Sequence, residues 1–124
     1  MKYLATAILA LALPAAAVSA TSTSGLRGVV LIDPAFPVCK AGQPCTRPAE
    51  NVRLDFVRNG RVVARTRTGD EGVYRVRLAP GTYSVTAPSP SPKKVGRRTL
   101  FPRRAAVPAG SYRRVVFRLD IGIR

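Results

Sequence analysis

Apolar and polar side chains alternate along the segment Val73–Ala87. An alternation with period two is the pattern of a β-strand that has one buried and one exposed face. Pro80-Gly81 interrupts the alternation with residues that favour a tight turn, so the pattern predicts two strands, Val73–Leu78 and Thr82–Ala87. The predicted buried positions of these strands are Tyr74, Val76, Leu78, Tyr83, Val85 and Ala87.

Five further segments have the character of strands. They are Leu26–Ile32, Val52–Arg58, Val62–Thr68, Thr99–Val107 and Arg113–Ile123. Pro102 cannot donate a backbone hydrogen bond, so we expect the strand that contains it at a sheet edge. The last segment has one apolar face, made of Val115, Phe117, Leu119, Ile121 and Ile123. Seven short strands with frequent turns predict an all-β sandwich.

The second and third of these strands are joined by Asn59-Gly60, a strong hairpin signal. A simple two-residue turn would set the apolar face of one strand against the polar face of the other. Because register follows the buried face, we expect a longer or bulged turn that aligns Phe56 with Ala64. The same register places Asp55 opposite Arg65 on the solvent side, where the two would form an ion pair.

The first 20 residues differ in composition from the rest of the chain. Lys2 precedes the apolar run Leu4–Leu13, Pro14 ends that run, and Val18-Ser19-Ala20 has the small residues of a cleavage site. A membrane anchor is the alternative, but a spanning helix needs about 20 apolar residues. We therefore expect a signal peptide over residues 1–20 and one secreted or otherwise extracytoplasmic domain over 21–124, in a periplasm or at a cell surface. No second apolar segment follows, so we expect no transmembrane segment in the mature chain.

Two cysteines, Cys39 and Cys45, lie in the first loop between predicted strands. Export and an even number of cysteines favour a disulfide bond. A redox role would need the tighter C-x-x-C spacing, and a metal site would need more ligands than two thiols. We expect a structural disulfide that contributes about 2–3 kcal/mol by closing a short loop.

The alternating segment, together with the upstream residues Thr66–Gly72, contains the pattern T-x-x-x-G-x-Y-x-V-x-L-x-P-G-x-Y-x-V. This resembles the carboxypeptidase regulatory-like family, most clearly over Asn51–Val85. The resemblance implies a prealbumin-like (transthyretin-like) sandwich with seven strands in a Greek-key order. Members of the family, including secreted bacterial ones, are similar in carrying a cysteine pair in the first loop. The catalytic domains that such modules accompany use zinc ligands that include histidine.

The chain contains no histidine. Imidazole metal sites and Ser-His-Asp or Cys-His nucleophile pairs are therefore excluded. The related transthyretin-like purine-pathway hydrolases also rely on histidine, so their activity is excluded as well. Asp70 and Glu71 are adjacent in a turn, and two neighbouring carboxylates do not make a calcium site. We expect no catalytic site, no metal and no cofactor.

Positive charge is the feature that bears on function. The chain has 21 basic and 6 acidic residues, a net charge of +15. One group of arginines occupies polar positions of three consecutive strands and is expected to share one sheet face: Arg53, Arg65, Arg67, Arg75 and Arg77. A second group lies in the last third of the chain: Arg97, Arg98, Arg103, Arg104, Arg113 and Arg114.

These arginines suggest that the exported domain binds polyanions, such as anionic lipid head groups, wall phosphates or acidic polysaccharide, because guanidinium matches phosphate and carboxylate. The alternative is a solvated face that only protects strands from edge pairing. A structural module with a protein partner also stays open. The resemblance of this superfamily to starch-binding-like sandwiches adds a carbohydrate-binding alternative, with Phe36, Phe101 and Tyr112 as loop aromatics. Nucleic acid is not expected, because Phe56, Tyr74, Tyr83 and Phe117 fall on core positions and export removes that ligand.

Overall fold

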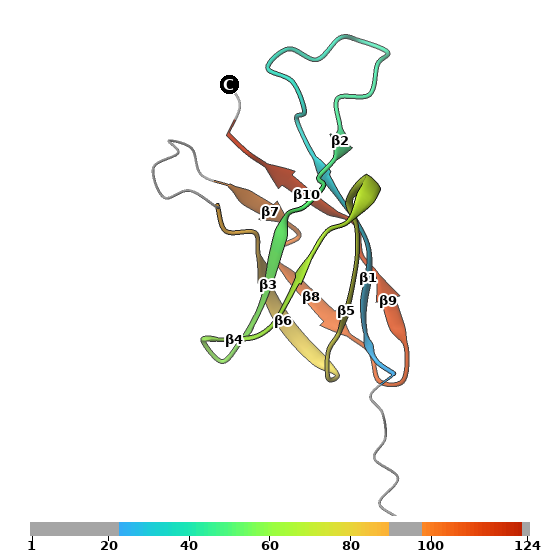
Figure 1. The fold of residues 1–124 in the computed structure, drawn as a ribbon, viewed down its shortest axis with the longest axis vertical. Coiled ribbons are helices and arrows are strands. Elements are labelled where there is room, and N and C mark those ends of the chain that lie inside the picture. Colours follow the sequence, from blue (N-terminus) through green and yellow to red (C-terminus); the bar gives the residue numbers. More distant parts are fainter. Residues whose placement is uncertain (1–22, 90–97, 123–124) are drawn as a thin grey trace, which may run out of the picture.

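The computed structural model describes residues 23–89 and 98–122, which form two β-sheets and no α-helix (Figure 1). The strands are β1 (Gly25–Ile32), β2 (Arg47–Pro48), β3 (Arg53–Arg58), β4 (Arg61–Arg67), β5 (Val73–Arg77), β6 (Gly81–Thr86), β7 (Thr99–Phe101), β8 (Arg104–Val107), β9 (Tyr112–Arg114) and β10 (Phe117–Asp120). A short 3-10 turn, η1 (Asp70–Gly72), precedes β5. The all-β class is confirmed. The expected signal peptide at residues 1–20 lies outside the described residues.

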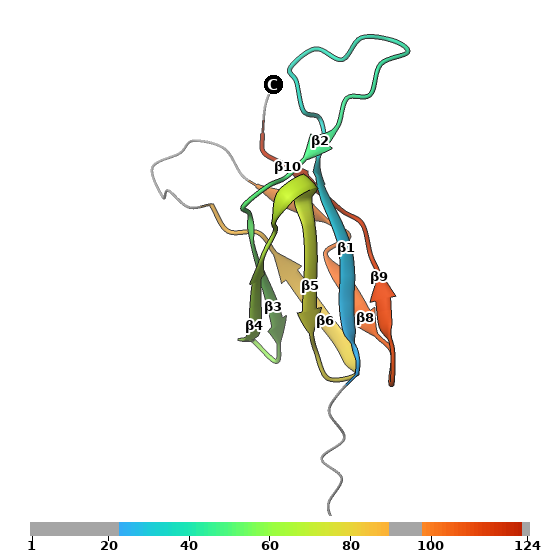
Figure 2. The same cartoon turned by 45° about the vertical axis from the view of Figure 1, so that its right-hand side comes forward.

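The first sheet is built around β1, the longest strand. On one side, β5 and then β2 pair with β1 in antiparallel orientation. On the other side, β9 and β10 pair with it in parallel and in one continuous register, from Gly25↔Tyr112 to Val30↔Phe117, and β7 pairs with β10. The second sheet has the antiparallel order β4-β3-β6-β8. Figure 2 shows β5, β1 and β9 side by side.

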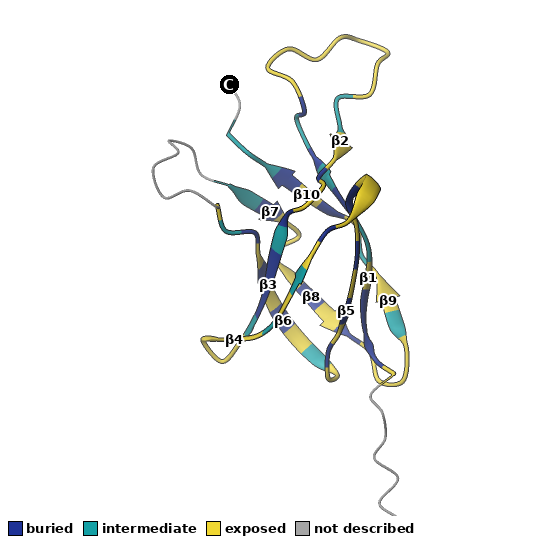
Figure 3. Cartoon of the chain, in the orientation of Figure 1, coloured by how far each residue is buried: buried dark blue, intermediate teal, exposed yellow. Residues whose placement is uncertain are grey.

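The core lies between the two sheets and includes most of the positions that the alternation predicts. From the predicted apolar face of the last strand, Val115 and Ile121 are only half-buried, and Ile123 lies outside the described residues. Figure 3 shows buried and exposed positions following one another along the strands. The four aromatic residues assigned to the core, Phe56, Tyr74, Tyr83 and Phe117, are at most 2% exposed. The rings of Tyr74 and Phe117 meet at 5.5 Å between centroids. The apolar face of each strand is therefore what joins the two sheets.

The β3–β4 hairpin has the expected register. Phe56 pairs with Ala64, and a bulge at Phe56/Val57 absorbs the extra residue before the Asn59-Gly60 turn. Asp55 also pairs with Arg65 as expected. The expectation that Asp55 lies on the solvent side is wrong in one respect, because its residue exposure is only 6%. Its carboxylate is covered by arginine side chains, whose long stems bury what the strand alternation would leave in water.

The two last predicted strands are each divided. Thr99–Val107 becomes β7 in the first sheet and β8 in the second, separated at Pro102. Both halves lie at the edge of their sheet, so the expectation of an edge strand is confirmed. Arg113–Ile123 becomes β9 and β10 around Val115-Val116. With the short β2, the described residues thus contain ten strand segments where seven were expected.

Tyr74 connects three parts of the first sheet. It pairs across the strands with Gly28, whose missing side chain leaves room for the phenol ring. The Tyr74 hydroxyl then donates a hydrogen bond of 2.6 Å to the carbonyl oxygen of Val115, between β9 and β10. Burial raises the pKa of this hydroxyl well above its usual value. The hydrogen bond holds β5 and the β9–β10 segment on the two sides of β1.

Candidate polyanion-binding surface

Three arginines lie in register across the outer face of the first sheet. Arg27 on β1 pairs with Arg75 on β5 and with Arg114 on β9. All three are exposed, and neighbouring strands are about 4.8 Å apart, so the three side chains leave the same sheet face from adjacent backbone positions. We call Arg75, Arg27 and Arg114 the arginine row. Like charges on adjacent strands repel each other, and a bound anion would relieve that repulsion.

Tyr112 fixes one end of this surface. It pairs with Gly25, which in turn pairs with Arg77 on β5. A Cβ atom at Gly25 would lie 2.7 Å from Tyr112 Cε2, so only glycine lets the ring lie across the strand. The Arg75 guanidinium carbon lies 4.0 Å from the centroid of the Tyr112 ring, a close cation–π contact. The aromatic ring thereby holds Arg75 over the sheet.

The expectation that five arginines share one sheet face is wrong. Arg75 and Arg77 lie on β5 in the first sheet, whereas Arg53, Arg65 and Arg67 lie on β3 and β4 in the second. Residues 68–72 between β4 and β5 cross from one sheet to the other and do not form a hairpin. The Thr68 side chain holds this crossing, since its hydroxyl accepts from the Val52 N–H at 2.8 Å and donates to the Ala49 carbonyl.

The three predicted site arginines on β3 and β4, Arg53, Arg65 and Arg67, have partners within the protein. Arg53 contacts Asp55 through Nε–Oδ1 and Nη2–Oδ2, both at 3.0 Å, and Arg65 Nε lies 3.5 Å from the same carboxylate. Arg67 donates to the carbonyl oxygen of Asn51 at 3.2 Å. These contacts neutralise or occupy part of each guanidinium. The second sheet therefore offers a weaker anion-binding face than the arginine row.

The second predicted group of arginines separates into three places. Arg114 belongs to the arginine row, and Arg113 reaches from β9 toward the carbonyl of Ala106 on β8, at 3.5 Å. Arg98, Arg103 and Arg104 line a common groove. Arg97 lies outside the described residues. The groove lies where the chain passes through Pro102 from β7 of the first sheet to β8 of the second, which begins at Arg104.

This groove has a volume of about 590 Å³. Val85, Ala87, Pro88 and Leu100 form the apolar part of its lining, and its polar residues are the three arginines and four hydroxyl residues, Ser84, Thr86, Ser89 and Thr99. Arg98 donates to the carbonyl of Pro88 at 3.1 Å, and partial burial lowers the pKa of its guanidinium. The residues that line the groove include arginines and hydroxyl groups but no carboxylate. This combination suits the binding of an anion.

Carboxylates are concentrated at one end of the sandwich. Asp33 follows β1 and accepts a hydrogen bond of 3.0 Å from Arg118, and Asp120 ends the adjacent strand β10. Glu50 accepts the backbone N–H of Glu71 at 3.2 Å in the turn next to this end. Asp70 shares that turn, and only Asp55 lies elsewhere. The arginine row is at the opposite end of β1, and its strands carry no carboxylate.

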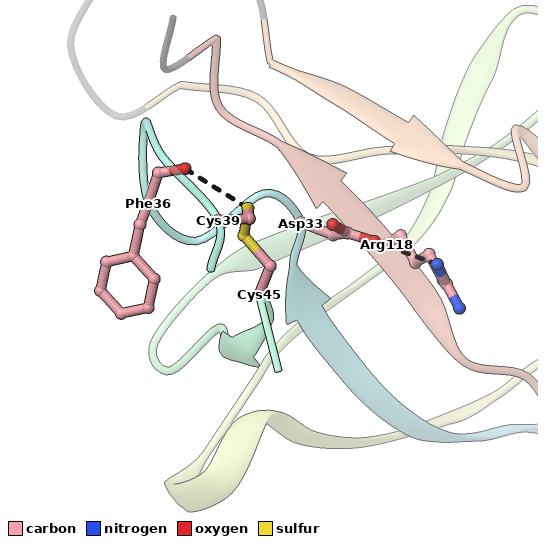
Figure 4. Close-up of a disulfide and its surroundings, with 5 residues drawn as sticks. All are labelled: Asp33, Phe36, Cys39, Cys45 and Arg118. Atoms are coloured by element: carbon pink, nitrogen blue, oxygen red, sulfur yellow. Dashed lines mark hydrogen bonds and ion pairs between the residues drawn. A yellow bond between two sulfur atoms is a disulfide. The ribbon is translucent and has the colours of Figure 1, made fainter. Parts of the chain in front are cut away.

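The loop between β1 and β2 projects from the acidic end (Figures 1 and 2). The expected disulfide between Cys39 and Cys45 is confirmed, with Cα atoms 5.5 Å apart. A 2.7 Å hydrogen bond from the Ala35 N–H to the Cys45 carbonyl closes the base of the loop. Figure 4 shows the Phe36 side chain directed away from the Asp33–Arg118 pair. Phe36 is 53% exposed.

The three aromatic residues considered for sugar binding lie on three separate elements. Phe36 is in the disulfide loop, but Phe101 lies on β7 and Tyr112 on β9, so the assignment of all three to loops is wrong. Arg103 lies 5.7 Å from the ring centroid of Phe101, as Arg75 lies over Tyr112. Two of the three rings thus contact guanidinium groups.

Comparison with known proteins gives no relative: no family model matches the chain, and neither a curated protein nor a solved structure matches it. Within residues 23–89 and 98–122, no helix has the length and hydropathy to cross a membrane. The same residues contain no cluster of three or more histidine, cysteine or acidic side chains that could hold a metal ion.

Proposed function

We propose that this protein is a secreted, non-catalytic module that attaches peripherally to anionic components of a cell envelope. The arginine row is the observation that carries the proposal. It places three exposed arginines at paired positions of neighbouring strands on one sheet face, at the end of β1 that lies away from the carboxylates. Guanidinium forms paired hydrogen bonds with phosphate and carboxylate, the charged groups of envelope polymers and lipids.

We also propose that the two sheets form a seven-stranded Greek-key sandwich of the prealbumin-like type, as in the carboxypeptidase regulatory-like family. Three features support this. The motif positions Tyr74, Val76, Leu78, Tyr83 and Val85 are buried, Pro80-Gly81 turns the chain between β5 and β6, and a disulfide closes the first loop. Ten strand segments reduce to seven if β7–β8 and β9–β10 are interrupted strands and β2 is a short addition.

The binding proposal is tested with the purified, oxidised protein, soluble polyphosphate and isolated cell envelopes, from low to high salt. We expect binding that weakens as salt rises, because exposed charges are screened over about 10 Å at 0.1 M salt. Changing Arg27, Arg75 and Arg114 together to glutamine should weaken binding to an anionic surface by about a hundredfold, roughly fivefold for each arginine.

The matched control changes Arg47, Arg61 and Arg67 to glutamine, which removes the same charge from exposed positions outside the arginine row. We expect a much smaller loss in this control. Equal losses in both variants would mean that overall charge, and not the arginine row, determines binding. Binding of neutral glycans that salt does not weaken would favour the carbohydrate-binding alternative.

A further inference from the structure

The outer face of the first sheet carries an apolar patch directly beside the arginine row. Val73, Val116 and Phe101 are 52%, 39% and 48% exposed, although valine and phenylalanine are usually buried. The half-buried Val29 lies on the same face. We call Val73, Val29, Val116 and Phe101 the apolar strip. Single exposed apolar residues are ordinary, but a cluster that borders a charged row suggests a binding surface.

The register of the strands places the strip next to the row. Val29 pairs with Val73, and each lies two residues from its arginine in the row, Arg27 and Arg75 respectively, so all four share one face. Val116 follows Arg114 by two residues in a segment whose register to β1 is continuous from β9 to β10. It therefore lies beside Val29.

Phe101 extends the strip to the edge of the sheet. It pairs with Arg118 on β10, and Arg103 lies 5.7 Å from its ring centroid. Because Arg118 is also paired with Asp33 at 3.0 Å, the cationic border of the aromatic ring comes mainly from Arg103. The face as a whole is thus an arginine row at one end of β1 and an apolar strip with further arginines beyond it.

We propose that this face binds a lipid bilayer that contains anionic head groups. This inference rests on the proposed function and names one component of the envelope as its target. A wholly polar polymer would satisfy the arginine row but would gain nothing from exposed valine and phenylalanine. At a bilayer surface the arginines contact lipid phosphates while the strip enters the boundary between head groups and acyl chains, so both halves of the face are used.

The experiment uses the oxidised mature protein, residues 21–124, and vesicles of phosphatidylglycerol and phosphatidylcholine in equal parts, with pure phosphatidylcholine vesicles and soluble polyphosphate as comparisons. Changing Val73 and Val116 to serine should weaken binding to the anionic vesicles by about tenfold and leave polyphosphate binding unchanged. The matched control changes Val62 and Val63 to serine, because these valines are 44% and 52% exposed on β4 of the other sheet. We expect this control to bind vesicles as the original protein does.

Depth of insertion gives a second measurement that does not depend on affinity. The chain contains no tryptophan, so Phe101→Trp introduces a single reporter. We expect its fluorescence to shift to shorter wavelength on anionic vesicles and to be quenched by brominated acyl chains. Val62→Trp, on the opposite sheet, should show neither effect.

The two proposals fail in different ways. If the Val73 and Val116 variant binds anionic vesicles as tightly as the original protein, or if the fluorescence of the Phe101→Trp variant is not quenched, the bilayer inference is wrong even when polyphosphate still binds. If the original protein binds neither vesicles nor polyphosphate, the proposed function itself is wrong. Equal binding to anionic and pure phosphatidylcholine vesicles would also overturn the role of the arginine row.

Discussion

The hydrogen bond from Tyr74 to Val115 should be important for stability. Tyr74→Phe removes one hydroxyl and leaves the ring, which is 2% exposed, in place beneath Gly28. A neutral hydrogen bond contributes about 1 kcal/mol, and a partly buried carbonyl left without its partner adds a cost of up to a similar size. We therefore expect a loss of about 2 kcal/mol in the free energy of unfolding, or about 8–16 °C in Tm for a domain of this size.

The pH dependence of the unfolding free energy provides a second, independent test of the role of the Tyr74 hydroxyl. Burial raises the pKa of Tyr74 in the folded protein, whereas the unfolded chain has the ordinary tyrosine value of about 10. The stabilisation is therefore complete below about pH 10 and is lost as the pH rises from there toward the folded-state value. Since Tyr74→Phe has no proton to lose, the stability difference between the two proteins should be about 1.4 kcal/mol smaller at pH 11 than at pH 8.

Urea denaturation, followed by circular dichroism at fixed ionic strength, measures both effects. Urea is preferred to guanidinium chloride because it does not screen the arginine charges. A loss below about 0.5 kcal/mol at neutral pH would refute the importance of the hydrogen bond. An alkaline decline of equal size in both proteins would refute the assignment of that decline to Tyr74.

Two further predictions concern the backbone and the disulfide. Gly28→Ala should destabilise the fold by about 3 kcal/mol or more, because its φ of +151° disfavours a side chain and the new methyl group would overlap the backbone carbonyl of Val115. The control Gly110→Ala places its methyl group in open space and should cost about 1 kcal/mol. Equal urea midpoints for the two variants would contradict this prediction. Changing Cys39 and Cys45 to serine should lower unfolding stability by about 2 kcal/mol through loop closure and leave the circular dichroism of the sheets intact, so a loss of sheet signal would contradict the peripheral role of the loop.

The sequence was sufficient for the strands and much of their packing. Alternation identified the buried positions of β3, β5 and β6, because one face of each strand must be apolar to join the two sheets. Matching the apolar faces also predicted the bulged register of Phe56 with Ala64. Pro102 indicated an edge because a proline cannot donate to a neighbouring strand.

The sequence did not predict that β4 and β5, although consecutive, lie in different sheets. A hairpin and a crossing between sheets place the same side chains inward, so alternation does not distinguish them. The crossing depends on distant contacts, such as Thr68 with Ala49 and the close approach of Gly72 to Val30. For the same reason the arginines of β4 and β5 were assigned to one face.

Arg27 was not among the predicted site residues, because it is the only arginine in its strand segment, Leu26–Ile32. The signal was present, since Arg27 occupies the polar phase of the first strand beside Leu26. Its role depends on pairing with Arg75 and Arg114, from distant parts of the chain, and local sequence does not contain that information. The burial of Asp55 is similar, because it results from the side chains of Arg53 and Arg65.

The separation of carboxylates from the arginine row gives the domain an electric dipole along β1. A dipolar protein turns as it diffuses toward a charged surface, so its arrival is not random in orientation. A negative surface would attract the arginine row first, and the end that carries Asp33, Asp120 and η1 would approach last, as the outer face of the first sheet settles on the bilayer. During this approach the disulfide loop, which projects from the carboxylate end (Figure 1), would be the last part to reach the surface, with Phe36 and Val38 exposed to a second molecule.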